Sequence, residues 1–403
     1  MKNILMSLFG FSFALVPMTT YSSPKPIEKE WTFLVFLNGN NSLDFFGSED
    51  INEMEQVGSS AHINVVVQWA SMARNDVLRM KIERDSLPQQ VSSPVIHNAG
   101  NVDMGDYRSL VDFVRWAKEK YPAKRYFIDV WNHGSGWHLK QKNLRGFHVK
   151  PQDISFDDKT GNVITTEQLG TAMREIQSLI GKKVSIYGSD ACLMAMIEVA
   201  SEMKDSVQYS VGSEEIEPGE GWHYGDFLRT WNELGPTAST EDVAKALTRT
   251  YKTSYQNGSQ GTQEVQLSAF NLEKTDELNL SIKTLSQELK TLARQSQAQV
   301  KLGIESSLSF LLSDYVDLYD FSLQLERQSL GVKLETLEKI RLNISHFVVS
   351  NEKTSYYSRA GGVSIWIPTV AYTYDEHKER YKNLDFSRVT LWKQFLEEFF
   401  KRK

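Results

Sequence analysis

Apolar runs rich in β-branched and aromatic residues alternate with amphipathic helical patterns along most of the chain. Strands that alternate with helices form a mostly parallel sheet covered by helices, so this order predicts an α/β fold. The expected strands are residues 31–37, 63–69, 77–82, 126–131, 184–187, 209–212, 265–270 and 362–367. The expected helices are residues 44–57, 106–120, 165–179, 192–203 and 240–256.

The C-terminal part of the chain departs from this alternation. From about residue 271 to 350 apolar side chains recur at helical spacing, as in Leu334 and Leu337, which predicts a helical insertion before the sheet resumes. We see no repeat and no flexible linker, so one domain is expected over 23–403. Its parts are a core at 31–260, the helical insertion at 271–350, and a returning strand and terminal helix at 360–403.

The first residues have the pattern of a secretory signal peptide. Lys2 precedes the apolar stretch 4–16, and a proline and a small polar run follow it. Such a stretch is too short to span a bilayer. We therefore expect cleavage near Ser22 or Ser23, with residues 1–22 as the leader, and export to a periplasm or outside the cell. No later segment is apolar for long enough to predict stable membrane insertion.

The charge balance argues against one class of partner. The chain has 45 Lys and Arg against 51 Asp and Glu, a formal net charge of −6. Proteins that bind nucleic acids need basic patches to contact phosphates, and no basic run between the termini supplies one. We therefore expect no nucleic-acid partner.

Cysteine usage points to a particular residue. The chain has a single cysteine, Cys192, which can form no internal disulfide. Exported proteins more often carry paired cysteines or none. Taken alone, Cys192 is either a small buried hydrophobic residue or a reactive thiol.

Titratable groups follow two of the expected strands. The strand at 126–131 leads into His133, and the strand at 184–187 leads shortly into Cys192. Ligands of parallel sheets collect at the carboxyl ends of strands. A helix starting at about Cys192 would favour the thiolate through its macrodipole. If the two strands are neighbours, His133 and Cys192 form a nucleophile and proton-shuttle pair.

These segments resemble the two catalytic motifs of the clostripain family of cysteine peptidases. The matching residues are His133-Gly134-Ser135-Gly136-Trp137 and Asp190-Ala191-Cys192-Leu193-Met194. The resemblance implies the caspase-like three-layer sandwich that this family shares with legumain and gingipain. It also implies that Cys192 forms a thioacyl intermediate and that His133 is the general acid and base. The backbone N–H groups of Gly134 and Cys192 are then candidates for the oxyanion hole.

Acidic residues bear on the substrate that this resemblance implies. Asp190 matches the acidic residue that the family has two positions before its nucleophile, and the family usually cleaves after Arg or Lys. A carboxylate-lined pocket selects a guanidinium or ammonium group. The glutamate-rich segment 213–222 follows the next expected strand, and it is either part of such a pocket or a solvated loop.

One position in this region departs from the family pattern. The residue after Gly-Trp is often acidic in the family, whereas His223 follows Trp222 here. This departure leaves Glu220 or Asp226 to supply further negative charge beside Trp222.

The resemblance also implies cleavage between the two motifs, because relatives are often activated there. Basic residues stand in this stretch at Lys140, Lys142, Arg145, Lys150 and Lys159, and exposed loops of this kind are preferred sites of nicking. We therefore expect self-processing, and a monomer or a self-cleaved two-chain form.

The chemistry implied by the resemblance requires no cofactor, although family members often depend on calcium. The segment 153–162 has oxygen ligands at alternating positions but lacks the twelfth-position Glu of an EF-hand loop, so the sequence locates no calcium site. His133 and His138 lack a third ligand at a spacing typical of zinc.

Two other functions stay open at this point. A catalytically silent, peptidase-like protein would use the acidic cleft to bind a basic peptide. A transpeptidase would use the same nucleophile but let an amine intercept the thioacyl intermediate before water does.

Overall fold

A central sheet organises the part of the chain that the computed structural model describes, which comprises residues 26–87, 89–138, 153–329 and 331–401. The strands of this sheet are Lys29–Gly39 (β1), Ile63–Ser71 (β2), Val77–Lys81 (β3), Val95–Gly100 (β4), Ala123–Trp131 (β5), Val184–Asp190 (β6), Val207–Gly212 (β7), Gln266–Asn271 (β10) and Val348–Lys353 (β12). Their order in the described residues is β12-β10-β7-β6-β5-β1-β2-β3-β4. The middle strands β7-β6-β5-β1-β2 are parallel, and antiparallel strands extend both edges.

Helices cover both faces of the sheet, as the α/β prediction requires. Side chains of β1 alternate between the faces: Leu34 and Phe36 belong to one hydrophobic core and Phe33 and Val35 to the other. The first core includes α2, α3 and α4, and the second includes α1, α5 and α6. These helices are Asp44–Glu55 (α1), Tyr107–Lys120 (α2), Thr166–Ile180 (α3), Ile197–Met203 (α4), Tyr224–Leu234 (α5) and Thr240–Ser254 (α6).

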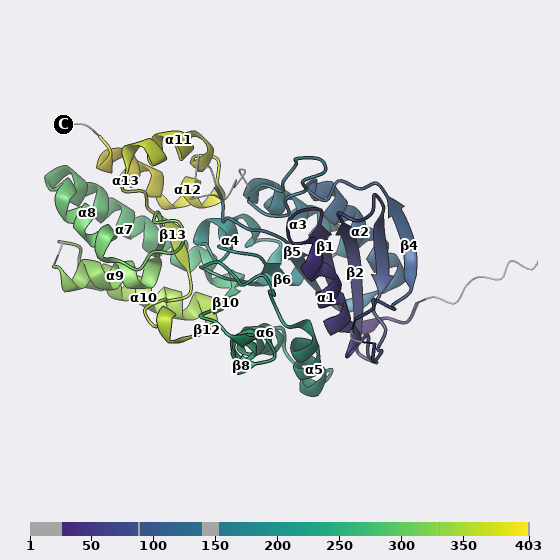
Figure 1. Cartoon of the computed structure of the whole chain (residues 1–403). Helices are drawn as coiled ribbons and strands as arrows, with labels where there is room; N and C mark the ends of the chain where they lie inside the picture. Colours follow the sequence, from purple (N-terminus) through teal and green to yellow (C-terminus); the bar gives the residue numbers. More distant parts are fainter. Residues whose placement is uncertain (1–25, 88, 139–152, 330, 402–403) are drawn as a thin grey trace, which may run out of the picture.

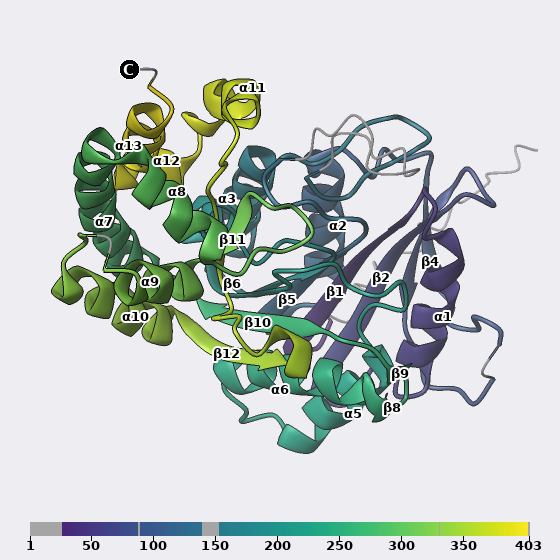
Figure 2. The ribbon, with the colours of Figure 1, turned by 60° about the vertical axis from the view of Figure 1, so that its left-hand side comes forward.

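The remaining helices form a group of their own. They are Thr275–Gln295 (α7), Gln297–Ser306 (α8), Leu318–Arg327 (α9), Leu334–Phe347 (α10), Ala371–Tyr381 (α11), Asp385–Thr390 (α12) and Trp392–Phe399 (α13). They gather at one end of the molecule, beside the β10 and β12 end of the sheet (Figure 1, Figure 2). α7 is central to the group because it packs against α8, α10, α12 and α13.

The strand that returns to the sheet is not the expected one. β12 lies at the edge, antiparallel to β10, whereas the expected strand at 362–367 is Ser364–Trp366 (β13), which pairs with Tyr315–Asp317 (β11) outside the main sheet. β13 is fully buried, so it has the apolar pattern of a core strand. β12 is half-buried and mostly polar, so its sequence lacks the apolar run that predicts a core strand.

The helix expected to start at Cys192 begins only at Ile197 (α4). Tertiary hydrogen bonds hold the intervening residues out of a helix: Leu193 donates its N–H to the Glu215 carbonyl at 3.1 Å, and Ala195 to the Ser213 carbonyl at 2.9 Å. Leu193 also has a positive φ of 65°. Cys192 therefore lies in a turn rather than at a helix N-terminus.

Some elements were not predicted. Among them are the amphipathic helix α5, the short strands β4 and β11, and the hairpin formed by Gln256–Gly258 (β8) and Gly261–Thr262 (β9).

Candidate active site

The two motifs emerge side by side from the carboxyl ends of β5 and β6. These strands are parallel neighbours, and Trp131 pairs with Asp190 at the end of the ladder. His133 and Cys192 each follow two positions after that pair. The pairing continues past the strands, because Asn132 donates its N–H to the Asp190 carbonyl at 3.1 Å. The fold thus brings both motifs to one sheet edge, where α/β proteins bind ligands.

Gly134 lies directly against the backbone of the second motif. A Cβ atom at this position would lie 2.4 Å from the Cys192 carbonyl oxygen and 2.9 Å from the Ala191 side chain. Neither atom could move without shifting the turn that carries the thiol. The glycine is therefore required by this close approach of two backbones.

The Cys192 thiol is half-buried and lies against the backbone of Glu217. Its Sγ accepts the Glu217 N–H at 3.3 Å, and the Glu217 carbonyl oxygen lies 3.9 Å from Sγ. Burial raises the pKa of the thiol to about 12, and the carboxyls of Glu217, Glu215 and Asp190 act in the same direction. The Glu217 N–H only partly opposes these effects. The thiol is thus protonated at pH 7 in this arrangement.

The His133 imidazole is half-buried as well. Its Nε2 lies 2.9 Å from the hydroxyl of Ser42, in the turn between β1 and α1. Burial lowers the pKa of His133 below its usual 6.5, and Asp158 offsets part of this shift. The imidazole is therefore mostly neutral at pH 7.

Buried carboxyls lie beneath the two motifs. Asp190 accepts the Trp222 N–H at 3.2 Å and the Tyr224 hydroxyl at 2.8 Å, and Tyr224 also contacts Asp129 at 2.7 Å. Burial raises the pKa of Asp190 to about 6. Asp190 therefore carries a negative charge at pH 7 that the surrounding hydrogen bonds stabilise.

Glu217 is the site residue that sequence reasoning did not single out. Its carboxyl lies beside Asp190, and burial together with the Asp190 charge raises the pKa of Glu217 well above its ordinary value. Its backbone also covers the thiol. Several glutamates stand in 213–222, and their spacing does not distinguish the inward-facing one. Contacts of 213–215 with the chain after Cys192 help to position the segment that carries it.

The other predicted substrate residues lie in different surroundings. Trp222 is fully buried, and its ring packs so closely on Gly188 that a Cβ there would lie 2.7 Å away. Glu220 is exposed, and its backbone carbonyl accepts a hydrogen bond from Gln260 at 3.0 Å. Trp222 thus supports the site from below, whereas the Glu220 carboxylate is open to solvent.

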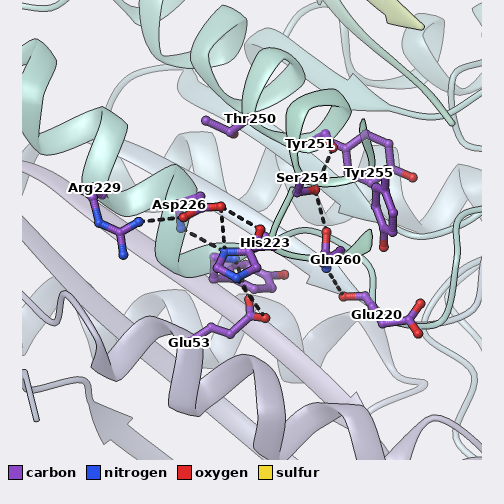
Figure 3. A network of polar contacts seen from close by, with 12 residues as sticks. Glu53, Glu220, His223, Asp226, Arg229, Thr250, Tyr251, Ser254, Tyr255 and Gln260 are labelled. Atoms are coloured by element: carbon purple, nitrogen blue, oxygen red, sulfur yellow. Dashed lines mark hydrogen bonds and ion pairs between the residues drawn. The ribbon is translucent and has the colours of Figure 1, made fainter. Parts of the chain in front are cut away.

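Asp226 is paired within its own helix. Its carboxylate lies 2.6 Å from Arg229 and accepts the Ser259 hydroxyl at 2.7 Å. Figure 3 shows Asp226 between Arg229 and His223, with Glu220 at the far side of the network beside Gln260. His223 caps α5 by accepting the Asp226 N–H at 3.0 Å. Much of the Asp226 charge is therefore already balanced inside this network.

The residues of the 153–162 segment do not fit a metal site. Asp153 pairs with Arg380 of α11, and the Asp157 carboxylate accepts hydrogen bonds from Asn40 and from the backbone of Met104, Lys159 and Thr160. Within the described ranges, no three His, Cys, Asp or Glu side chains are grouped to hold a metal ion.

Of the basic residues at which self-processing is expected, only one lies among the described residues. Lys140, Lys142, Arg145 and Lys150 lie outside the described residues. Lys159 lies inside them, and its ammonium donates to the carbonyls of Ser71 and Arg74 at 2.7 and 2.5 Å. The expected leader at 1–22 is also outside the described residues. Of the helices that are described, none combines the length and apolarity needed to cross a bilayer.

Comparison with known sequences identifies relatives that match most of the chain. The model of the clostripain family matches residues 35–399. Clostripain from Hathewaya histolytica is 22% identical over 413 residues, which cover 88% of this chain and 77% of the relative.

Solved structures share the fold across their whole length. A secreted C11 cysteine protease from Bacteroides thetaiotaomicron, in complex with an irreversible peptide inhibitor, has a TM-score of 0.68 and 21% identity, covering 90% of this chain and 99% of that one. An inactive zymogen of a C11 protease from Parabacteroides distasonis has a TM-score of 0.67 and 17% identity, covering 91% and 99%. These likenesses establish the caspase-like α/β architecture that the sequence motifs implied.

Proposed function

The chain belongs to the clostripain family of cysteine peptidases, and on this premise we propose that it is a secreted endopeptidase that cleaves after Arg or Lys through Cys192 and His133. The observation that carries the proposal is the parallel register of β5 and β6. Because Trp131 pairs with Asp190, His133 and Cys192 occupy equivalent positions on adjacent strand ends. A nucleophile and its proton shuttle must be neighbours in this way.

The reaction proceeds in two steps. Cys192 Sγ, its proton passed to His133, attacks the scissile carbonyl carbon, and the N–H groups of Gly134 and Cys192 are candidates to stabilise the oxyanion. The C–N bond breaks as His133 protonates the leaving amine, which leaves a thioester on Cys192. Water, deprotonated by His133, then attacks the thioester, and the departing sulfur regains its proton. An amine in place of water would give transpeptidation.

A basic side chain before the scissile bond matches the charge of the site. Asp190 is ionised at pH 7, and its carboxylate can pair with a guanidinium or ammonium group. Glu217 lies beside Asp190. Glu220, three residues further along the same segment, is exposed. We assign the main charge of the pocket to Asp190, with the exposed Glu220 adding to it, whereas burial and the Asp190 charge favour the protonated form of Glu217. Asp226 contributes less because Arg229 already pairs with it.

The substrate preference is tested with fluorogenic peptides carrying Arg, Lys, Asp or Leu before the scissile bond. We expect turnover only of the Arg and Lys peptides. Replacing Asp190 by Asn keeps the size of the side chain but removes the charge, so kcat/KM for these peptides falls about 100-fold, as when one partner of a buried charge pair is lost.

Glu233→Gln is the matched control, because Glu233 is exposed on α5 and its neutralisation leaves the pocket unchanged. Equal turnover of all four peptides would contradict the assigned specificity. Tight binding of a basic peptide without any turnover, even after nicking, would favour the silent binding protein instead.

The arrangement around the thiol has the features of a resting form. Glu217 covers Cys192 Sγ, and a protonated thiol is a poor nucleophile. We propose that cleavage within 139–152, after one of its basic residues, releases this cover. The structure from Parabacteroides distasonis is described as an inactive zymogen of a C11 protease, which supports such a state in the family.

Nicking should leave the two fragments bound to each other. β5 lies before the cut and β6 after it, and they pair from Phe127 with Ile186 to Trp131 with Asp190. We therefore expect nicked protein to elute as one species in size-exclusion chromatography and to separate only in denaturant. The nicked form should also react faster with iodoacetamide at Cys192. Purified Cys192→Ala protein should stay intact, and its cleavage to the same fragments would contradict self-processing.

A further inference from the structure

The hydroxyl of Ser42 contacts the imidazole that shuttles the proton. Ser42 Oγ lies 2.9 Å from His133 Nε2, although the two residues are far apart in the sequence. We propose that Ser42 is the positioning residue of His133: it holds Nε2, so that Nδ1 exchanges the proton with Cys192 and the leaving amine. This inference rests on the proposed peptidase function and adds a third residue to it.

The turn that carries Ser42 is held by buried asparagine amides. Asn41 accepts the Leu43 N–H at 2.8 Å and donates to the Asn38 and Phe156 carbonyls, both at 3.0 Å. Asn38 itself donates to the Phe156 carbonyl at 3.0 Å. These bonds fix the turn without using the Ser42 side chain. The hydroxyl is therefore free to act on the imidazole, and its removal leaves the turn in place.

The same amides fix the position of His133. Asn132, the residue before it, donates to the Asn38 carbonyl at 2.8 Å and accepts the Phe156 N–H at 2.7 Å. Both the turn of Ser42 and the start of the histidine loop are thus tied to Asn38 and Phe156. Because both segments bond to the same two residues, the distance between the hydroxyl and the imidazole is fixed, as a preorganised catalytic group requires.

The hydroxyl also suits the charge that the imidazole acquires during catalysis. A serine oxygen can accept the Nε2–H of either the neutral ring or the imidazolium. Burial disfavours the imidazolium, as the lowered pKa of His133 shows, and an oxygen acceptor offsets part of that cost. Ser42 is exposed in the free protein, and a bound peptide that excludes water would strengthen its bond to the ring.

The test compares Ser42→Ala, Ser42→Thr and Ser48→Ala in the self-cleaved or nicked protein, with an Arg peptide as substrate. Ser42→Ala should lower kcat about tenfold, the scale of one hydrogen bond to a reacting group, with KM unchanged because the hydroxyl touches the ring and not the substrate. The acid limb of the pH profile, which reports protonation of the neutral His133 that must accept the thiol proton, should move to lower pH. Ser42→Thr keeps the hydroxyl and should restore both.

Ser48→Ala is the matched control, because its hydroxyl donates only to the Phe45 carbonyl of the same segment at 3.2 Å. The inference is overturned if Ser42→Ala retains kcat within twofold and an unshifted pH profile while the unsubstituted protein turns over. It is also overturned if Ser42→Thr shows the same loss as Ser42→Ala. An inactive unsubstituted protein would instead contradict the proposed function itself.

Discussion

The Cys192→Ala variant should lose turnover of Arg and Lys peptides by about four orders of magnitude or more, as for other enzymes that lose their nucleophile. Cys192 is the only cysteine of the chain, so no other thiol can take over the attack. Its turn is held by backbone bonds of Leu193 and Ala195, which an alanine at 192 leaves intact. The variant should therefore fold normally and, once nicked by an added protease, still bind a basic peptide. Steady-state kinetics and a binding titration on the same preparation check both statements.

A matched control separates loss of the nucleophile from loss of structure. Ser201→Ala, on the following helix α4, also removes one heavy atom from a buried side chain, which contacts Asn279 at 3.2 Å. We expect its kcat to stay close to that of the unsubstituted protein. Turnover by Cys192→Ala above a few per cent would show that another group performs the chemistry, and the cysteine peptidase assignment of this site would be wrong.

The central strands were predictable because burial on both faces leaves a continuous apolar signal. β1, β2, β5 and β6 contain their expected runs and extend beyond them, and the helix boundaries at Asp106 and Thr165 follow from local caps. Asp106 accepts the Arg108 N–H at 2.9 Å, and Thr165 forms a capping box with Gln168. The juxtaposition of the two motifs then required only that β5 and β6 be neighbours.

Features that depend on distant contacts could not be predicted in this way. The turn after Cys192 has a helical pattern but is held open by the backbone of 213–215. Glu217 and Glu220 have the same side chain and stand close together, yet the Glu217 carboxyl is buried beside Asp190 and the Glu220 carboxylate faces solvent. Ser42 reaches His133 from the end of another strand. No local pattern encodes such partners.

The C-terminal segment also supports the loop from His133 to His138, which its late position in the sequence does not suggest. Trp137 ends the histidine motif, and its ring packs at 5.0 Å on both Trp366 of β13 and Tyr381 of α11. Trp366 in turn donates its indole N–H to Asp314 at 2.8 Å, and Asp314 lies 3.3 Å from His138. Residues after 310 thus form the wall against which the loop from His133 to His138 is packed.

This packing predicts a large effect of Trp366→Ala on stability. Trp366 is fully buried, so its removal leaves a cavity beneath Trp137 and costs about 3–5 kcal/mol of the free energy of unfolding. Asp314 also loses a donor. We expect chemical denaturation to show this loss, and kcat to fall because the histidine loop is no longer supported.

Two further variants test whether the cavity explains the loss of stability and whether the unsupported loop from His133 to His138 explains the loss of kcat. Trp366→Phe fills most of the space but cannot donate to Asp314, so it should lose less stability than Trp366→Ala and keep more activity. Trp116→Ala removes from α2 a half-buried indole, which stacks on Phe113 and His97 rather than on Trp137. Trp116→Ala should lower the free energy of unfolding less than Trp366→Ala does and leave kcat unchanged. If Trp366→Ala lowers stability but not kcat, the C-terminal wall stabilises the fold without positioning His133.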